Sequence, residues 1–178
     1  MSLTPDDKLD HILGRRSIRV YSPGAVSEET VVRLLKAAMA APSAMTKDPW
    51  RFVVVRSQPT LRQMAAALPG GKMLSTAALS IVVCGDMEAV FEGQLSFLLQ
   101  DCSACIQNLL LAAHALGLGA CWVGVHPSED ALRRLRDLLA LPARMVPVAA
   151  ISLGHPGEKL EARTRYNADY LRQEQWGA

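Results

Sequence analysis

The order of the apolar segments constrains the fold of this chain more than any other sequence feature. Two helical patterns come before the first segment that has the β-branched character of a buried strand. A doubly wound α/β fold usually opens instead with a strand that leads into a glycine-rich phosphate loop. Neither GxGxxG nor GxxxxGKS/T occurs in the chain. The sequence therefore argues against a Rossmann dinucleotide site and against a P-loop nucleotidase.

Helix and strand patterns then alternate along the chain. Thr4 and Ser27 are expected to begin the first two helices, and the second helix stops before Pro42. Residues 51–56, 79–84, 120–125 and 145–153 are rich in apolar and β-branched residues and are predicted as strands. Further helices are predicted over 57–68, 88–116 with a break near Gly93, and 128–139. We expect one domain over residues 1–178.

Composition excludes several classes of protein. Nineteen Lys and Arg face seventeen Asp and Glu, a balance that does not favour nucleic acid or a membrane surface as partner. The acidic, polar N-terminus is unlike a secretory signal, so we expect a cytoplasmic protein. The most apolar stretch, 104–124, is interrupted by Gln107, Asn108 and His114 and is predicted as a buried helix that leads into a buried strand.

Cysteine and histidine show no clear metal or redox pattern. Cys102 and Cys105 have CxxC spacing, but they lie inside a helical pattern and not at the exposed helix start that a thioredoxin-like pair needs. Reduced thiols in a core are the simpler interpretation, and a redox role for the pair stays open. The four histidines are scattered, and no metal is expected.

The last segment, residues 157–178, is polar and has no core-forming period. Such a tail is either disordered or laid over a partner chain. The isolated aromatics Tyr166, Tyr170 and Trp176 favour the second alternative.

Two clusters of arginine stand out in a nearly neutral chain. Arg15, Arg16, Ser17 and Arg19 place three guanidiniums and a hydroxyl within five residues, and Arg163 and Arg165 form a second pair. Guanidiniums match phosphate oxygens, so both clusters together suit one phosphate. The alternative is a solvated basic turn.

Two segments of small residues have the character of ring-binding backbone. Residues 40–44 (AAPSA) would let a flat ring lie against the chain, and residues 117–124 (GLGACWVG) allow a close backbone approach. The alternatives are an ordinary loop after a helix and a tight helix-to-strand turn.

These segments, in this order and spacing, resemble the nitroreductase family of FMN-dependent oxidoreductases, and most of all its short single-domain members. The resemblance covers nearly the whole chain and rests on residues 14–21, 41–44, 49–50, 100–104, 107–113, 117–124, 153–156 and 163–176. It implies an α+β fold with a central, mostly antiparallel sheet flanked by helices. It also implies an intertwined homodimer, in which the C-terminal tail adds to the partner's sheet and two FMN molecules occupy the interface.

The resemblance assigns the phosphate end of the cofactor site to Arg15, Ser17 and Arg165, with Arg163 close by. Arg16 would contact the ribityl chain or the isoalloxazine, and Arg19 the pyrimidine edge, where Lys72 is a further match.

The ring end follows in the same way. Trp122, Val123 and Gly124 would lie along the rings, with the Gly124 N–H directed at flavin N5, while the other subunit would contribute Pro42, Ser43, Ala44 and Met45. Phe91 and Phe97 are candidates for substrate contact, with core packing as the alternative. Three positions depart from the family pattern, Thr46, Asp48 and Pro69, and they put the hydrogen bonding of the flavin edge in doubt.

The implied activity passes electrons from NADH or NADPH through flavin N5 to a small organic acceptor of nitroaromatic or quinone type, by a ping-pong mechanism. No catalytic side chain is needed, because catalysis rests on placement and on flavin electronics. The alternatives are a specialised flavin dehydrogenase or dehalogenase on the same fold, and a non-catalytic flavin-binding protein.

Overall fold

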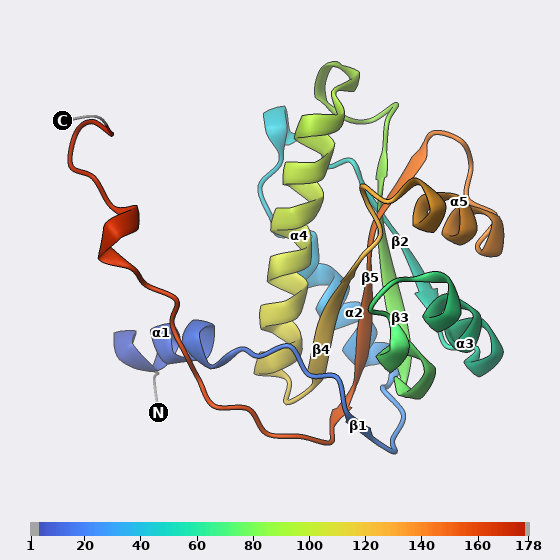
Figure 1. Cartoon of the computed structure of the whole chain (residues 1–178), viewed down its shortest axis with the longest axis horizontal. Helices are drawn as coiled ribbons and strands as arrows, with labels where there is room; N and C mark the ends of the chain where they lie inside the picture. Colours follow the sequence, from blue (N-terminus) through green and yellow to red (C-terminus); the bar gives the residue numbers. More distant parts are fainter. Residues whose placement is uncertain (1–3, 177–178) are drawn as a thin grey trace.

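The fold centres on a five-stranded sheet in which all neighbouring strands are antiparallel; the computed structural model describes residues 4–176 (Figure 1). Strand β5 (Met145–Pro156) lies in the middle. One edge of β5 pairs with β3 (Leu79–Asp86), which pairs in turn with β2 (Trp50–Val55). The opposite edge pairs with β4 (Gly119–Gly124), and the two-residue β1 (Tyr21–Ser22) pairs with the last two residues of β5.

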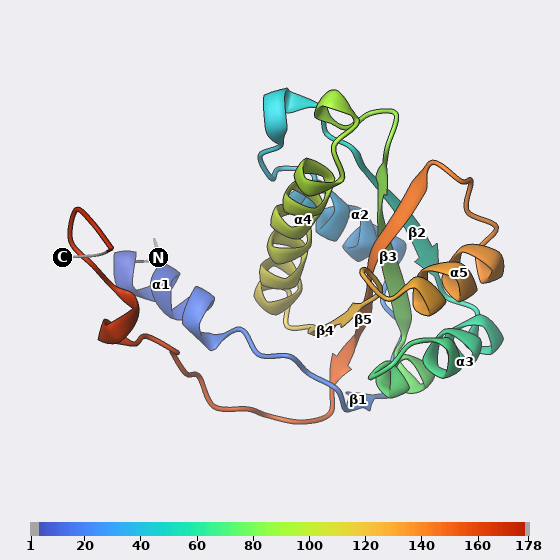
Figure 2. The same ribbon diagram turned by 45° about the horizontal axis from the view of Figure 1, so that its top comes forward.

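Helices cover both faces of this sheet (Figures 1 and 2). On one face lie α2 (Glu28–Ala38) and the long α4 (Leu95–Ala115), whose apolar side chains share one core with the sheet. On the other face α3 (Gln58–Ala67) and α5 (Glu129–Leu138) close a second core. Every residue of β3 is buried, as expected for a strand covered on both faces. The α+β architecture with an antiparallel sheet is confirmed.

Four helices begin at the hydroxyl side chains that the sequence pattern indicates. Thr4, Ser27, Ser57 and Ser128 each accept a hydrogen bond from a backbone N–H in the first turn of α1 (Pro5–Gly14), α2, α3 and α5. A hydroxyl cap of this kind stabilises a helix by about 1 kcal/mol relative to alanine, because it satisfies an N–H that has no partner inside the helix.

The predicted helix over 88–116 is wrong at its beginning. Helix α4 begins at Leu95, and a 3₁₀ turn, Phe91–Gly93, precedes it. The carboxylate of Asp86 accepts the Glu88 N–H at 3.1 Å, and Glu92 and Gly93 have φ angles of 52° and 64°. These features break the helical path before α4. Strand β1 was not predicted either, because two residues show no periodicity.

By length and composition alone, helix α4 is long and apolar enough to cross a membrane. Its apolar character has another cause here. The helix packs between α2 and the sheet, and Leu98, Ile106 and Leu109 are fully buried there. It is the core helix that the sequence predicted.

Helix α1 and residues 157–176 project away from the sandwich side by side, and are here called the arm (Figures 1 and 2). No residue of α1 is buried, and Leu9, Ile12 and Leu13 are exposed. The tail is exposed as well, with Tyr166 74% and Trp176 71% exposed. The arm therefore carries several apolar and aromatic side chains that the rest of its own chain does not cover.

Candidate functional site

The segment from Arg15 to Arg19 joins α1 to the sheet and is held mainly by its backbone. The Ile18 N–H donates to the Ala120 carbonyl of β4 at 3.0 Å, and the Tyr21 hydroxyl donates to the Ile18 carbonyl at 2.9 Å. The carboxylate of Glu158 accepts the Arg19 N–H at 2.6 Å. Because these bonds use backbone groups, the side chains of Arg15 and Arg16 are left available to a ligand, whereas Arg19 donates to the Ser17 carbonyl at 3.3 Å.

The two arginine clusters meet in one cavity of about 410 Å³, here called the arginine pocket. Its lining includes Arg15, Arg16 and Ser17 from one side and Arg163, Thr164 and Arg165 from the tail. The lining holds four guanidiniums and no carboxylate. Within residues 4–176 none of the four forms an ion pair.

Arg16 adds an independent sign of a missing anion. Its Nε atom is buried and has no hydrogen-bond partner within the described residues. Burial of an unpaired charged donor is costly, and a phosphate oxygen is a suitable acceptor for it. The donors of the arginine pocket therefore fit a phosphate group.

Stacked imidazoles attach α1 to the end of α4 beside this pocket. The rings of His11 and His114 lie 4.8 Å apart, nearly parallel, and His11 Nε2 lies 3.1 Å from the Leu111 carbonyl oxygen. Burial lowers the pKa of His114, and the nearby His11 and Arg15 lower it further. His114 also lines a second cavity of about 300 Å³, which shares Arg15 and Arg16 with the arginine pocket.

Strand β4 presents an open backbone. Trp122 is 36% exposed and Gly124 is exposed, whereas Val123 points into the core between the sheet, α3 and α5. A methyl group placed on Gly124 would meet nothing within 4 Å. A flat group therefore has free access to the Gly124 backbone. Val123 could contact such a group only through its backbone, because its side chain is in the core.

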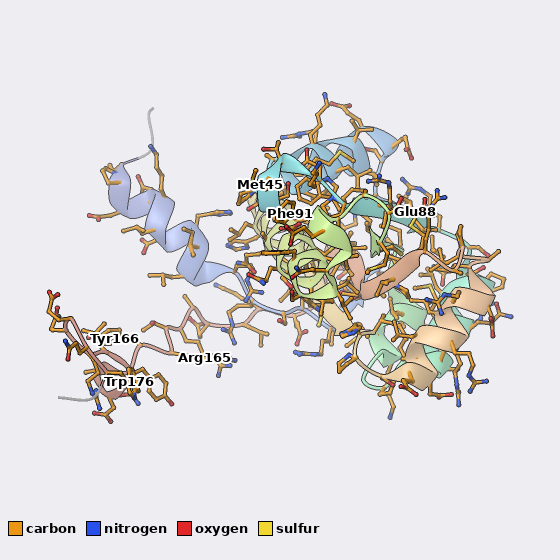
Figure 3. All side chains as sticks on the ribbon, turned by 90° about the horizontal axis from the view of Figure 1, so that it is seen from above. Met45, Glu88, Phe91, Arg165, Tyr166 and Trp176 are labelled. Atoms are coloured by element: carbon orange, nitrogen blue, oxygen red, sulfur yellow. The ribbon has the colours of Figure 1, made fainter. Side chains whose placement is uncertain are left out.

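The segment 42–48, here called the 42–48 loop, lies at the other end of α4. Met45, Thr46 and Asp48 have φ angles of 51°, 54° and 47°, and Met45 is 72% exposed. Figure 3 shows Met45 and Phe91 close together on the body, and Arg165 far from both on the arm. The rings of Phe91 and Phe97 make an edge contact at 5.5 Å between centroids.

Asp48 has a structural use within this loop. Its N–H donates to Ser43 Oγ at 3.0 Å, and the Ser43 hydroxyl donates back to its carboxylate. The carboxylate that departs from the family pattern thus closes the loop. Thr46 and Pro69 are exposed.

One chain does not bring all the predicted residues together. Asp101, which contacts the 42–48 loop, precedes His114 by thirteen residues on α4, a distance of about 20 Å along the helix. The 42–48 loop therefore lies toward the start of α4, whereas the chain that follows α1, which carries Arg15 and Arg16, passes the other end of α4 (Figure 1). Arg19 and Lys72 are exposed and lie outside the lining of the arginine pocket, Lys72 on a 3₁₀ segment packed against α3.

The cysteines lie in the core. Burial raises the pKa of Cys84 and of Cys105 to about 12, and it also raises the pKa of Cys102 and Cys121. Thiols in this state are poor nucleophiles at neutral pH. Across residues 4–176, no three His, Cys, Asp or Glu side chains gather in a way that could hold a metal ion.

Three residues that organise the site were missed by sequence reasoning: Tyr21, Asp101 and Glu158. Asp101 and Glu158 each contact the backbone of a segment far away in the sequence, whereas the Tyr21 hydroxyl contacts the Ile18 carbonyl three residues away and Ser152 Oγ of β5. The motifs around Tyr21 and Asp101 were visible, but nothing in them specifies which backbone group each side chain contacts.

Fold and pocket together define a class: an α+β protein with an antiparallel sheet and an arginine-lined pocket that is built partly from a projecting arm. The family model described as "Nitroreductase family" matches residues 12–78 and 69–155. An Archaeoglobus fulgidus protein named "Putative NADH dehydrogenase/NAD(P)H nitroreductase" is 42% identical over 174 residues, which is 96% of this chain and 99% of that protein.

Solved structures agree. A Bacteroides thetaiotaomicron protein with the same name is 39% identical, with a TM-score of 0.91 over 97% of this chain and 100% of that one. A Desulfovibrio desulfuricans structure described as "a putative nitroreductase in complex with FMN" is 37% identical, with a TM-score of 0.83 over 98% and 99%. The chain belongs to the nitroreductase family, which confirms the resemblance.

Proposed function

We propose that this protein is an FMN-dependent NAD(P)H oxidoreductase whose two cofactor sites lie between the subunits of a homodimer. The observation that carries this proposal is the convergence of four unpaired guanidiniums on one pocket, beside a strand with open backbone. The FMN complex of the Desulfovibrio relative and the NAD(P)H in the name of the Archaeoglobus relative support the cofactor and the electron donor.

The phosphate of FMN is assigned to the arginine pocket. Arg15, Ser17 and Arg165 bind its oxygens, with Arg163 close by, and Arg16 donates its buried Nε–H to the phosphate or to the ribityl chain. The lining carries no carboxylate that would repel the anion. Riboflavin, which lacks the phosphate, should therefore bind much more weakly than FMN.

The ring is assigned to the exposed face of β4. Trp122 and the backbone of residues 122–124 lie along it, and the Gly124 N–H approaches N5. Arg19 and Lys72 supply positive charge at the pyrimidine edge, where negative charge grows on reduction. When bound, FMN would supply the redox chemistry that links the nicotinamide to an acceptor, in ping-pong order.

The second wall of each site comes from the partner subunit in this proposal. The 42–48 loop lies about 20 Å along α4 from the side chains at the arginine pocket, so it faces away from the cofactor that its own chain holds. The arm, with its exposed apolar residues, provides the surface through which two chains intertwine.

The acceptor is a small, flat organic molecule of nitroaromatic or quinone type. Phe91 lies near Met45 (Figure 3) and its ring contacts that of Phe97, and the two rings suit stacking on such a molecule. No titratable side chain in this region is required to act as acid or base.

The test is the visible absorption of the purified protein before and after anaerobic NADH or NADPH. The proposal predicts oxidised flavin bands that bleach on addition and return with menadione or a nitroaromatic. Flavin that binds without bleaching would favour the non-catalytic alternative. Bleaching without turnover of either acceptor would favour a specialised dehydrogenase or dehalogenase. A protein that takes up no FMN would refute the proposal.

A further inference from the structure

A buried carboxylate on α4 has no part in the chemistry proposed above. Asp101 is 5% exposed and lies beside Cys102, in a helix that packs into the core. Its Oδ2 is buried and has no hydrogen-bond partner within the described residues. A buried acidic side chain with one unsatisfied oxygen is costly to the fold and calls for a compensating role.

The other oxygen of Asp101 holds the 42–48 loop. Oδ1 accepts the Ala44 N–H at 3.0 Å, across a sequence separation of 57 residues. In the part of the chain that the structure describes, Arg51 is the other side chain that reaches this loop from outside, through the Asp48 carbonyl at 3.1 Å. Asp101 therefore anchors the first half of the loop and Arg51 its end.

The conformation of the loop needs such an anchor. Met45, Thr46 and Asp48 have left-handed φ angles that non-glycine residues adopt at a cost. The remaining bonds are internal, such as the bond from the Asp48 N–H to Ser43 Oγ. Internal bonds shape the loop but do not fix it to the body. The bond to Asp101 places the backbone of Ala44, and with it the exposed Met45, at the end of α4.

We propose that Asp101 is a positioning residue that fixes the 42–48 loop as the wall which one subunit offers to the flavin bound by its partner. This proposal rests on the proposed function, since the wall has a use only if FMN occupies the interface. The part that Asp101 plays is that of a hydrogen-bond acceptor. Within the described residues the bond from Ala44 to Oδ1 is the one hydrogen bond that Asp101 makes, and the amide oxygen of asparagine can accept the same bond.

The experiment compares Asp101→Ala and Asp101→Asn, with Cys105→Ala as the matched control. Cys105 is buried one turn further along α4, and its removal leaves the loop anchor intact. Hydrogen exchange of the loop amides is measured on the FMN-free protein. Affinities for FMN and for riboflavin are then measured by quenching of flavin fluorescence.

We expect exchange at Ala44 to rise at least about tenfold in Asp101→Ala, and to stay near wild type in Asp101→Asn and Cys105→Ala. The affinities for FMN and for riboflavin should fall by the same factor in Asp101→Ala, about tenfold. The reason is that the 42–48 loop no longer holds the flavin ring, while the arginine pocket is intact. Unchanged exchange in Asp101→Ala would overturn the proposal, and so would equal losses in all three variants.

The two proposals fail in different ways. If wild-type protein takes up no flavin, the proposed function fails, and the wall assignment for Asp101 fails with it. If wild type binds FMN and Asp101→Ala binds it equally well with a loosened loop, only the wall assignment is overturned. If Asp101→Ala does not fold, Asp101→Asn tests the proposal instead. Faster exchange of the loop amides or weaker flavin binding in that variant would contradict the role of Asp101 as a hydrogen-bond acceptor.

Discussion

The sandwich and the arm of this chain differ in how their apolar residues are used. In the sandwich, residues such as Ile81, Leu109 and Ile151 are fully buried between sheet and helices. In the arm, Leu9, Ile12 and Trp176 are mostly exposed, although α1 has a well-formed helix cap. The sandwich is complete within one chain, whereas the arm has the composition of an interface with nothing of its own chain to cover it. This difference is the one that the proposed intertwined dimer requires.

Removal of the tail is the largest change that separates the two regions. A chain that ends at residue 160 keeps all five strands and both cores. It should fold, but run as a monomer and lose FMN entirely, because Arg163 and Arg165 go with the tail. Sedimentation together with flavin absorbance checks this. A truncated chain that stays dimeric and yellow would show that the arm is not the interface.

Paired substitutions compare the sandwich and the arm residue by residue. Ile151→Ala, in the central strand β5, should lower the free energy of unfolding by about 2–5 kcal/mol at any protein concentration. Ile12→Ala, in the arm, should leave the dissociated chain within about 0.5 kcal/mol of wild type and weaken only the dimer. Chemical denaturation at two protein concentrations measures both. A large, concentration-independent effect at Ile12 would place α1 in the core of its own chain.

A single arginine of the arm should report on the phosphate. Arg165→Ala should weaken the binding of FMN by about 10- to 100-fold, because a charge-assisted bond to the phosphate is lost. The affinity for riboflavin should be unchanged. Arg62→Ala, at an exposed position on α3, serves as the control. Flavin titration measures both ligands. An equal loss of affinity for FMN and for riboflavin would show that the phosphate does not bind in this pocket.

The smallest effect concerns the contact of α1 with α4. The fold lowers the pKa of His114, so it favours the neutral imidazole. Above the unfolded pKa of about 6.5 both states are neutral and the contribution is fully present. As the pH falls below that value the unfolded chain takes up a proton first, and stability is lost until the folded protein is protonated too.

The pH effect is tested on FMN-free protein, since a bound phosphate would favour the protonated ring. The loss should be under about 1 kcal/mol, because the ring is only partly buried. His114→Gln should flatten the dependence of Tm on pH between 8 and 5, while His155→Gln, at an exposed position, should not. A His114→Gln variant with the wild-type slope would assign the dependence to other groups.

Much of the fold was predictable because local patterns decide it. The apolar segments and hydroxyl caps located the helices and four strands, since each signal acts within a few residues. Strand β1 and the start of α4 were not predictable. The first depends on pairing with the end of β5, and the second on the Asp86 carboxylate that turns the chain.

The candidate site likewise has a part that the sequence indicates and a part that depends on tertiary structure. Clusters of arginine are visible in a nearly neutral sequence, so an anion site could be proposed from the residues alone. The tail and α1 run side by side and so bring both clusters to one pocket. This arrangement depends on tertiary structure, and the sequence does not specify it. The anchor Asp101 acts through a backbone N–H of a distant loop, and Tyr21 links the Ile18 carbonyl to the Ser152 hydroxyl of β5. Such contacts leave no pattern in the sequence.

The most direct test of the shared site is complementation between two defective subunits. One chain carries Arg15→Ala and Arg165→Ala, and the other carries Ala44→Trp in the 42–48 loop; different tags allow the mixed dimer to be isolated. Neither homodimer should hold FMN. If each site takes its arginines from one chain and its wall from the other, the mixed dimer has one intact site and should bind about one FMN. A mixed dimer that binds none would contradict the shared site and place each flavin within a single chain.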